Sequence, residues 1–142
     1  MGYAQSFEEL IVYKRAFAVS ESIFRLSKNF PKEEKFSLTD QIRRSSRSIG
    51  AQIAEAWGKR RYEKHFISKL TDADAEQLEA QHWVSIASSC GYLNEENKIQ
   101  LIKDLKETGR MLQSMINKSM LFCGKPPEIN EELAEYMIIR NQ

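Results

Sequence analysis

The stretch "LTDQIRRSSRSIGAQIAEAWG", residues 38–58, decides the fold of this 142-residue chain. Its large apolar side chains follow one another at intervals of four, seven, four and four residues: Leu38, Ile42, Ile49, Ile53 and Trp57. At about 100° per residue these positions lie within a stripe roughly 100° wide, and the arginines of the stretch lie on the opposite side. The pattern predicts an amphipathic helix from about Leu38 to Trp57 that ends at Gly58.

A first helix is expected before this stretch. Ser6 and Glu9 form a capping-box pattern that predicts its start, and Pro31 disfavours helical backbone at Phe30 and so predicts its end. Large apolar side chains recur at helical spacing along the segment. We therefore expect the core face of this helix to consist of Phe7, Leu10, Ile11, Tyr13, Phe17 and Phe24.

Two more helices are expected after residues 38–58. A third helix over about residues 62–90 has the predicted core face Phe66, Leu70, Ala73, Gln77, Val84 and Ala87, with Ile67, Leu78 and Ile86 beside it. Gly91 follows where a left-handed residue can end a helix, and Asn94 is a suitable cap for the next one. The fourth helix has the predicted stripe Leu101, Ile102, Leu105, Leu112, Met115 and Ile116.

Four helices with short connections and one apolar face each predict an all-α fold. The expected architecture is an antiparallel up-down-up-down four-helix bundle over residues 1–124. The stretch "CGKPPEIN" predicts the end of the fourth helix and a linker, and "EELAEYMIIR" after it predicts a short amphipathic helix. Residues 125–142 are therefore predicted to be a C-terminal linker and a short extra helix.

The composition restricts the class of protein. Hydrophobic residues make up 42% of the chain and charged residues 29%, as in a soluble globular domain. No apolar run approaches the roughly 20 residues that cross a membrane, and the N-terminus lacks the pattern of a signal peptide. The two cysteines, Cys90 and Cys123, lack metal-ligand spacing, and we interpret them as thiols in a reducing cytoplasm.

An enzymatic site is not indicated. A carboxylate-bridged di-iron centre in a bundle needs two Glu-x-x-His motifs, but the chain has one, from Glu79 to His82. His65, the only other histidine, follows Tyr62 at that spacing. There is no glycine-rich phosphate loop, and neither cysteine has a histidine close in sequence. We therefore expect no enzyme activity, no cofactor and no metal.

Basic residues offer the main candidate site. Residues 41–70 carry eight basic side chains and two acidic ones, whereas residues 71–97 carry six acidic side chains and no Lys or Arg. The predicted basic patch consists of Arg43, Arg44, Arg47, Lys59, Arg60, Arg61, Lys64 and Lys69. Such a surface suits phosphate neutralisation.

An equally supported alternative is that the patch pairs, within or between subunits, with acids of the third helix: Asp72, Asp74, Glu76 and Glu79. Glu55 is interpreted as an ion-pair partner of nearby arginines or as part of a subunit contact. Trp57 fits the core stripe and such a contact better than it fits base stacking.

Several segments carry a resemblance to a known family: "FEELIVYKRA", "FPKEEKFSLTDQIRRSSRSIGAQIAEAWGK", "FISKLTDADAEQLEAQ" and "GYLNEE". From about Phe7 to Ser119 the chain resembles the bacterial four-helix bundle family of 23S rRNA intervening sequence proteins. It departs from the usual family pattern at Gly50, where proline is common, and at Ala56, where glycine is common.

The resemblance implies a small antiparallel bundle that assembles as a ring, typically a homopentamer. A related branch, the accessory variability proteins of diversity-generating retroelements, is similar in fold and binds nucleic acid and a reverse transcriptase. In a ring of five, Arg43, Arg44 and Arg47 would bring fifteen arginines to one assembly. Two hypotheses follow. The first is a non-enzymatic cytoplasmic ring that contacts RNA or DNA through the basic patch; the second is a protein-interaction scaffold whose patch serves assembly.

Overall fold

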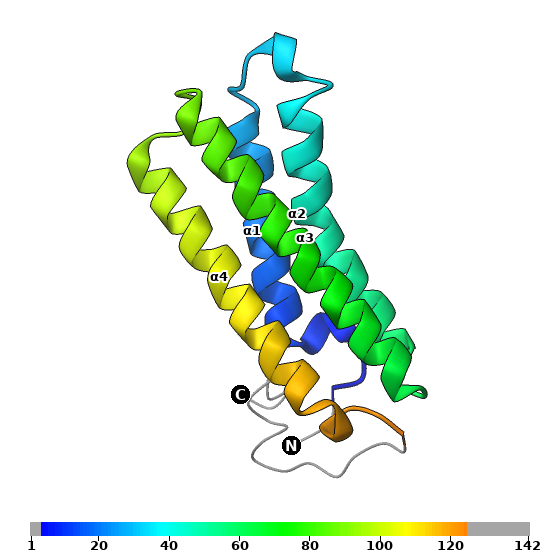
Figure 1. The fold of residues 1–142 in the computed structure, drawn as a ribbon. Helices are drawn as coiled ribbons and strands as arrows, with labels where there is room; N and C mark the ends of the chain where they lie inside the picture. Colours follow the sequence, from blue (N-terminus) through cyan, green and yellow to red (C-terminus); the bar gives the residue numbers. More distant parts are fainter. Residues whose placement is uncertain (1–3, 125–142) are drawn as a thin grey trace.

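The structure, a computed structural model, describes residues 4–124. Within this range it contains four α-helices and three short 3-10 helices, in the order η1 Phe7–Glu9, α1 Ile11–Ser27, η2 Lys32–Glu34, α2 Leu38–Gly58, α3 Glu63–Ser89, α4 Glu95–Asn117 and η3 Ser119–Leu121. Figure 1 shows the chain reversing its direction at each connection between consecutive α-helices. The helices pack as α1–α2, α2–α3, α3–α4 and α1–α4, which confirms the predicted all-α bundle.

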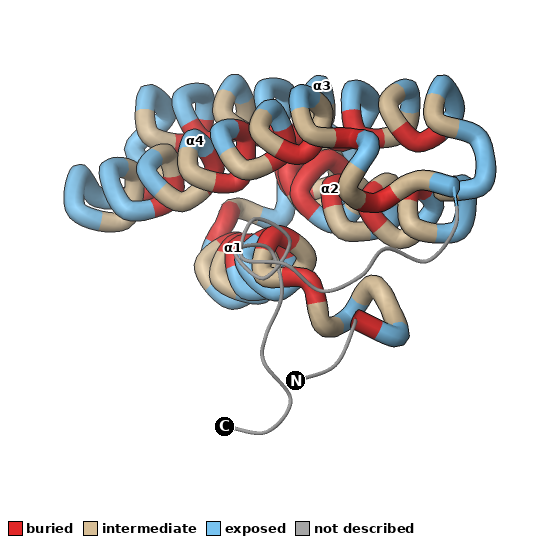
Figure 2. The backbone as a smooth tube through the Cα atoms, turned by 90° about the horizontal axis from the view of Figure 1, so that it is seen from below, coloured by how far each residue is buried: buried red, intermediate tan, exposed pale blue. Residues whose placement is uncertain are grey.

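The stripe of α2 forms the centre of the core, as the sequence predicts. Leu38, Ile42, Ile49 and Ile53 are buried, and Trp57 packs half-buried against the end of the core. Full burial of each large aliphatic side chain contributes about 1.5–3 kcal/mol of transfer free energy. This stripe therefore holds α2 against its neighbours, and Figure 2 shows buried positions turned toward the interior of the bundle.

The buried side of α3 has the heptad spacing of a coiled-coil seam. Its buried residues alternate at intervals of four and three: Phe66, Leu70, Ala73, Gln77, Ala80, Val84 and Ala87. Small residues in such a seam allow close helix approach. The predicted face is confirmed for these positions except Ala80, which it omitted. The prediction that Leu78 and Ile86 lie in the core beside this face is wrong, because both residues lie outside the seam and are exposed.

Gln77 is the polar member of this seam. Its side chain is buried, donates from Nε2 to Asp74 Oδ1 at 2.9 Å, and accepts from Gln81 at Oε1 at 2.7 Å. Gly109 of α4 faces it: a Cβ there would come within 2.7 Å of Gln77 Nε2. A side chain at position 109 would therefore require the Gln77 side chain to move. On α4, Leu101, Leu105, Leu112 and Met115 are buried as predicted, whereas Ile102 and Ile116 are half-buried.

The predicted face of α1 is largely wrong. Leu10 is buried, but the core side of the helix consists of Val12, Ala16, Val19 and Ile23. The expected aromatic side chains lie on the adjacent side, toward α2, where Phe17 is 51% exposed. Both stripes have helical spacing, so periodicity alone does not decide between them.

The start of α1 also differs from the prediction. Ser6 makes no side-chain cap hydrogen bond and precedes η1, and α1 itself begins at Ile11. The carboxylate of Glu9 accepts instead from the backbone N–H of Gln5 at 3.1 Å. The capping box is therefore not formed as expected.

The other helix ends follow the expected chemistry more closely. The backbone N–H of Asn97 donates to Asn94 Oδ1 at 2.7 Å, which confirms the cap of α4. Gly91 has φ +82°, and the N–H groups of Gly91 and Tyr92 donate to the carbonyls of Ser88 and Ala87. This is the Schellman arrangement, which favours glycine.

α2 ends at Gly58, as predicted. Gly58 does not adopt the left-handed conformation, however, because positive φ angles within residues 4–124 occur only at Gly91 and Gly124. None of the helices in this part of the chain is long and apolar enough to span a membrane. The predicted C-terminal linker and helix lie outside the described residues.

Candidate nucleic-acid interface

The structure divides the predicted basic patch into two groups. Arg43, Arg44 and Arg47 lie in the first half of α2, whereas the other basic residues follow its C-terminal end. From Arg47 to Lys59, twelve residues at 1.5 Å each correspond to about 18 Å along the helix. The two groups are therefore separate surfaces.

Arg47 and Arg43 converge on one aromatic ring of α1. The guanidinium carbon of Arg43 lies 4.7 Å, and that of Arg47 5.0 Å, from the centroid of Phe24. Lys28 Nζ lies 4.9 Å from the same centroid. Cation–π attraction at exposed sites contributes about 0.5–1 kcal/mol per pair, so the ring holds the three cations near one another. Among residues 4–124 no ion pair neutralises any of the three.

These arginines differ in their other contacts. Arg43 is half-buried, and its Nε donates to the hydroxyl oxygen of the buried Ser27 at 2.8 Å. Arg44 is exposed and forms an ion pair with Asp40 of the preceding turn at 3.2 Å. Arg47 is exposed, and its guanidinium lies over the ring of Phe24. Arg43 thus contributes to folding as well as to charge, whereas Arg47 is the more available cation.

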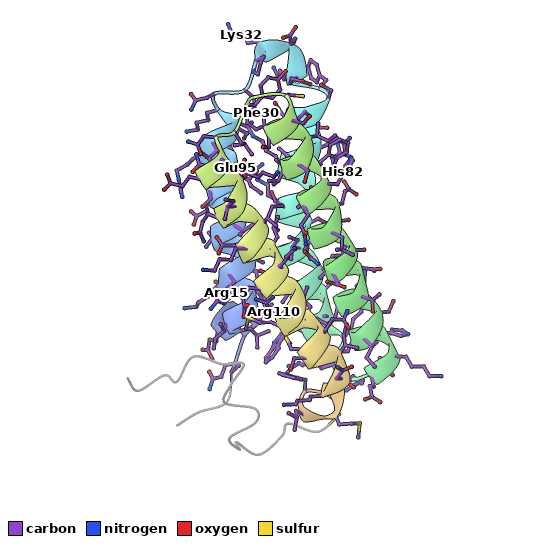
Figure 3. The ribbon with its side chains drawn as sticks, turned by 60° about the vertical axis from the view of Figure 1, so that its left-hand side comes forward. Arg15, Phe30, Lys32, His82, Glu95 and Arg110 are labelled. Atoms are coloured by element: carbon purple, nitrogen blue, oxygen red, sulfur yellow. The ribbon has the colours of Figure 1, made fainter. Side chains whose placement is uncertain are left out.

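Lys35 and Phe36, in the connection between η2 and α2, extend this surface. Lys35 Nζ lies 5.3 Å from the centroid of Phe36, whose side chain is 85% exposed. With Arg43, Arg44 and Arg47 they line a shallow groove of about 610 Å³. We refer to Lys28, Lys35, Arg43, Arg44 and Arg47 as the α1–α2 basic surface. Figure 3 shows nearby Lys32 at the end of the bundle, on η2.

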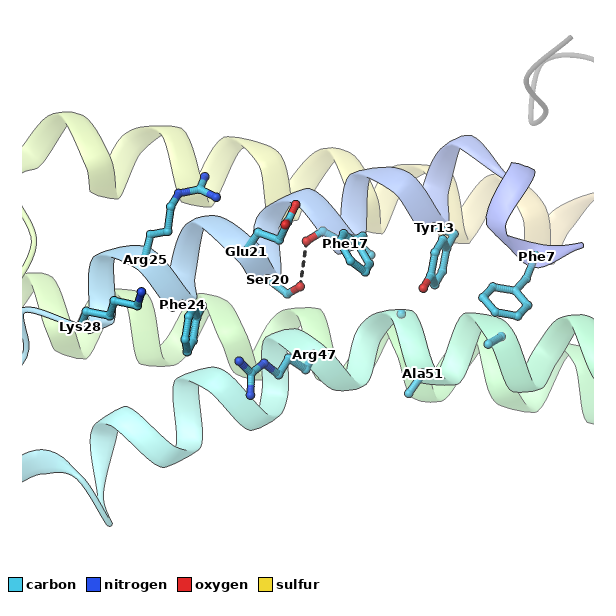
Figure 4. A pocket seen from close by; sticks show the side chains of 13 residues that line it. Phe7, Tyr13, Phe17, Ser20, Glu21, Phe24, Arg25, Lys28, Arg47 and Ala51 are labelled. Atoms are coloured by element: carbon cyan, nitrogen blue, oxygen red, sulfur yellow. Dashed lines mark hydrogen bonds between the residues drawn. The ribbon is translucent and has the colours of Figure 1, made fainter. Parts of the chain in front are cut away.

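A second groove runs between α1 and α2 beside this surface. It has a volume of about 640 Å³. Phe7, Tyr13, Phe17 and Phe24 line one side, and Arg47, Gly50, Ala51 and Ala54 line the other. Figure 4 shows Lys28, Arg25 and Arg47 near the Phe24 end and Phe7 at the opposite end. We call it the aromatic groove. The aromatic groove was not predicted from the sequence, because helical periodicity assigned these aromatic residues to the core.

The α2–α3 turn contains the remaining basic group. Lys59, Arg61 and Lys64 are exposed. Arg60 is different: its guanidinium carbon lies 3.6 Å from the centroid of the Trp57 ring, and its Nε donates to the Trp57 carbonyl at 2.8 Å. Burial lowers the pKa of Arg60, although the guanidinium remains charged. Arg60 therefore packs the end of α2, and Trp57 has an intramolecular role.

Lys69 lies apart from both groups, on α3. Its Nζ lies 3.6 Å from Glu55 Oε1 and donates to Gln52 Oε1 at 3.5 Å. Glu55 was predicted to pair with arginines or to take part in a subunit contact. Its observed partner is a lysine of the adjacent helix, so this ion pair connects α2 to α3.

The acids of α3 do not neutralise the predicted patch inside the described chain. Asp74 accepts hydrogen bonds from Gln77 and Gln113, and Glu79 accepts from the Trp83 indole at 3.0 Å. Burial, with the nearby charges of Glu79 and Asp72, raises the pKa of Glu76. Across residues 4–124, no ion pair joins Asp72, Asp74, Glu76 or Glu79 to the eight basic residues.

The other polar groups in the described part of the chain include two histidines and two cysteines. No group of three or more His, Cys, Asp or Glu side chains in residues 4–124 is placed to hold a metal ion. His82 is exposed on α3 (Figure 3). Cys90 is exposed, and burial, together with the negative charge of Glu63, raises the pKa of the Cys123 thiol to about 11. Cys123 is therefore a poor nucleophile near neutral pH.

The fold and its surfaces define a small helical bundle with a basic and aromatic face between its first two helices. Residues 8–114 match the family model of the 23S rRNA-intervening sequence protein. The chain belongs to this family, which confirms the resemblance seen in its sequence.

Among solved structures, the chain is similar to a protein of unknown function from the S23 ribosomal protein family of Bacteroides thetaiotaomicron. The two share 30% sequence identity and a TM-score of 0.69, with 75% of this chain and 96% of that chain covered. A comparison with curated proteins found no match. The family match and this neighbour indicate no catalytic family.

Proposed function

We propose that this protein binds RNA or DNA, without catalysis, by holding phosphate groups on the α1–α2 basic surface. The observation that carries the proposal is the convergence of Lys28, Arg43 and Arg47 on Phe24, without an ion pair among residues 4–124. Cations held together without carboxylate partners attract a polyanion, and binding releases the counterions condensed on it.

The surface suits backbone contact more than recognition of base edges in a duplex. Its cations come from Lys28 at the C-terminal cap of α1, from the η2–α2 connection and from one side of α2, so they form a broad patch around the Phe24 ring. Lys28, Lys35, Arg43 and Arg47 provide up to four contacts per protomer, and Arg44 is partly neutralised by Asp40. Four phosphate contacts predict a log–log slope of affinity against salt of about −3.6 on duplex DNA.

Assembly into a ring, which we propose to be a homopentamer, would multiply these contacts. Each further protomer that reaches the same nucleic acid binds at a high effective concentration, so modest affinities combine into tight binding. A protein partner is compatible with this step.

The test is fluorescence anisotropy with a structured RNA and a duplex DNA, titrated from low to physiological salt. We expect affinity to fall linearly in log–log form. Arg47→Gln should reduce the slope, whereas Lys103→Gln removes one exposed charge from α4, outside the α1–α2 basic surface, and should leave it unchanged. Absence of binding even at low salt would refute the proposal.

A second candidate function is a protein-interaction scaffold. Large apolar side chains are exposed on the outer sides of two helices, with Leu78 on α3 and Ile99 on α4 both more than half exposed. In this case the acids of α3 would meet the basic residues of a neighbouring copy. Sedimentation of the full chain and of a variant lacking residues 125–142 tests part of this role, since loss of the oligomer would assign the tail to assembly.

A further inference from the structure

The aromatic groove is an open site formed by residues that a bundle normally buries. The Phe7 and Tyr13 rings have centroids 4.8 Å apart, and Tyr13 and Phe17 follow at 6.0 Å. Phe17 remains 51% exposed, and the ring of Phe24 continues the row along α1. The groove thus offers a series of aromatic surfaces to a ligand with apolar, planar groups (Figure 4).

The opposite side of the groove leaves room for such a ligand because its residues are small. Ala51 and Ala54 of α2 line the groove opposite the aromatic row. At Gly50 the ring of Tyr13 already occupies the space, since a Cβ there would lie 3.4 Å from Tyr13 Cε1. Larger residues at Ala51 and Ala54 would fill the groove. The volume of about 640 Å³ is within the range that accommodates small organic groups such as nucleobases.

Charge distinguishes the two ends of the groove. Arg25, Lys28 and Arg47 line the Phe24 end, together with one acid, Glu21. Arg25 donates from Nη2 to the hydroxyl of Ser22 at 3.3 Å, and in residues 4–124 none of the three cations is in an ion pair. The groove therefore combines an aromatic surface with excess positive charge at one end. This complements a ligand whose planar rings are attached to an anionic chain.

We propose that the aromatic groove binds unstacked bases of single-stranded RNA or DNA, while Arg47 and Lys28 hold the phosphates next to those bases. This inference rests on the proposed nucleic-acid function and specifies its substrate class. Aromatic side chains beside a basic track bind single strands because every base has a π-face, whereas the bases of a duplex are already stacked on one another. Duplexes would contact the α1–α2 basic surface without entering the groove.

The experiment compares the affinities of the full-length protein for an unstructured oligonucleotide of about 12 nucleotides and for a duplex of similar length, by anisotropy at fixed salt. Phe17→Ala removes an exposed ring, and Ala54→Leu fills the groove without changing a charge. Met120→Ala, at a side chain 75% exposed on η3, is the matched control. We expect both groove variants to weaken single-strand binding about 5- to 150-fold, with duplex binding unchanged.

Each other outcome has a defined meaning. If the single strand binds no better than the duplex and neither groove variant changes its affinity, the groove does not bind bases. Duplex binding that depends on Arg47 would still support the proposed function in that case. If neither nucleic acid binds, both proposals fail. If the groove variants dissociate the oligomer and lower both affinities equally, a second copy occupies the groove and the inference is overturned. Sedimentation of every variant distinguishes these cases.

Discussion

Arg47 and Arg43 contact the same aromatic ring, yet their replacement by glutamine should have different consequences. Arg43 donates from Nε to Ser27 Oγ at 2.8 Å and lies 4.7 Å from the Phe24 centroid, partly buried. Arg47 lies 5.0 Å from the same centroid and is exposed. Arg43→Gln therefore removes a packed hydrogen bond together with a charge, whereas Arg47→Gln removes mainly a charge.

The two effects differ in size. A hydrogen bond that involves a charged group contributes about 1.5–3 kcal/mol to stability. For a domain of this length that corresponds to a decrease of roughly 5–10 °C in the Tm of Arg43→Gln. An exposed cation–π contact contributes at most about 1 kcal/mol, so the Tm of Arg47→Gln should decrease by less than about 4 °C. On duplex DNA each arginine lost from a phosphate contact should reduce the salt slope by about 0.9 per contacting protomer.

The assay is thermal unfolding followed by circular dichroism, combined with salt-dependent anisotropy on the same preparations. Lys103→Gln, which makes the same change in net charge on α4, gives the baseline. A salt slope for Arg47→Gln equal to that of Lys103→Gln would refute the assignment of Arg47 to phosphate binding. Dissociation of the proposed homopentamer by Arg47→Gln would instead place this arginine in a subunit contact.

Three further outcomes are expected. The hydrogen bond to the carboxylate of Glu34 at 2.9 Å raises the pKa of Tyr92 to about 12, so Glu34→Gln should lower that pKa toward 10 in an ultraviolet titration. Because folding raises this pKa, the bond stabilises the fold fully below about pH 10, and its contribution is lost as the pH rises through about 12. A thiol reagent at pH 8 should modify the exposed Cys90 well before Cys123, whose pKa of about 11 leaves only about one thiolate in a thousand, and mass spectrometry would detect the reverse order. Gly91→Ala should destabilise the protein by about 1–2 kcal/mol, because alanine disfavours a φ of +82°, and an unchanged denaturant midpoint would contradict this.

The sequence predicted α2 and α3 well for a physical reason. α2 has one strongly apolar side and a polar remainder, so only one orientation buries its large side chains. On α3, where Leu78 and Ile86 are exposed outside the buried seam, the heptad spacing identifies the buried side instead. In α3, the heptad alternation of Phe66, Leu70 and Ala73 continues through the buried Gln77. A helix with a single apolar stripe thus determines its own orientation, and no knowledge of its neighbours is needed.

The first helix had two apolar stripes, and the sequence alone could not choose between them. Its aromatic residues are larger and so appeared to be the better core. The bundle instead buries the stripe of smaller side chains, Val12, Ala16, Val19 and Ile23, and with this side α1 packs against α2 and α4. The choice depends on the shape of the neighbouring helices. For the same reason, the aromatic groove could be located only in three dimensions.

Local sequence was also a poor guide to the composition of the candidate site. Six cations occur within residues 41–61, but the helix places Arg47 and Lys59 about 18 Å apart, a distance that corresponds to about ten phosphate charges along duplex DNA. The cations nearest to Arg47 around Phe24 include Lys28, which is brought there by the antiparallel packing of α1 on α2. The register of that packing depends on the path of residues 28–37, including η2, which apolar periodicity does not specify.

The division of the predicted patch also determines how its function should be tested. Arg60 packs on Trp57, and its backbone carbonyl accepts from the N–H of Gly124 at 3.0 Å. Lys69 holds Glu55. Replacing all eight basic residues together would remove these stabilising contacts along with the exposed charges, so loss of binding could result from loss of the fold. Only exposed members such as Arg47 separate the two effects. A test of binding at the α1–α2 basic surface therefore relies on exposed charges such as Arg47, and not on Arg43, which also stabilises the fold.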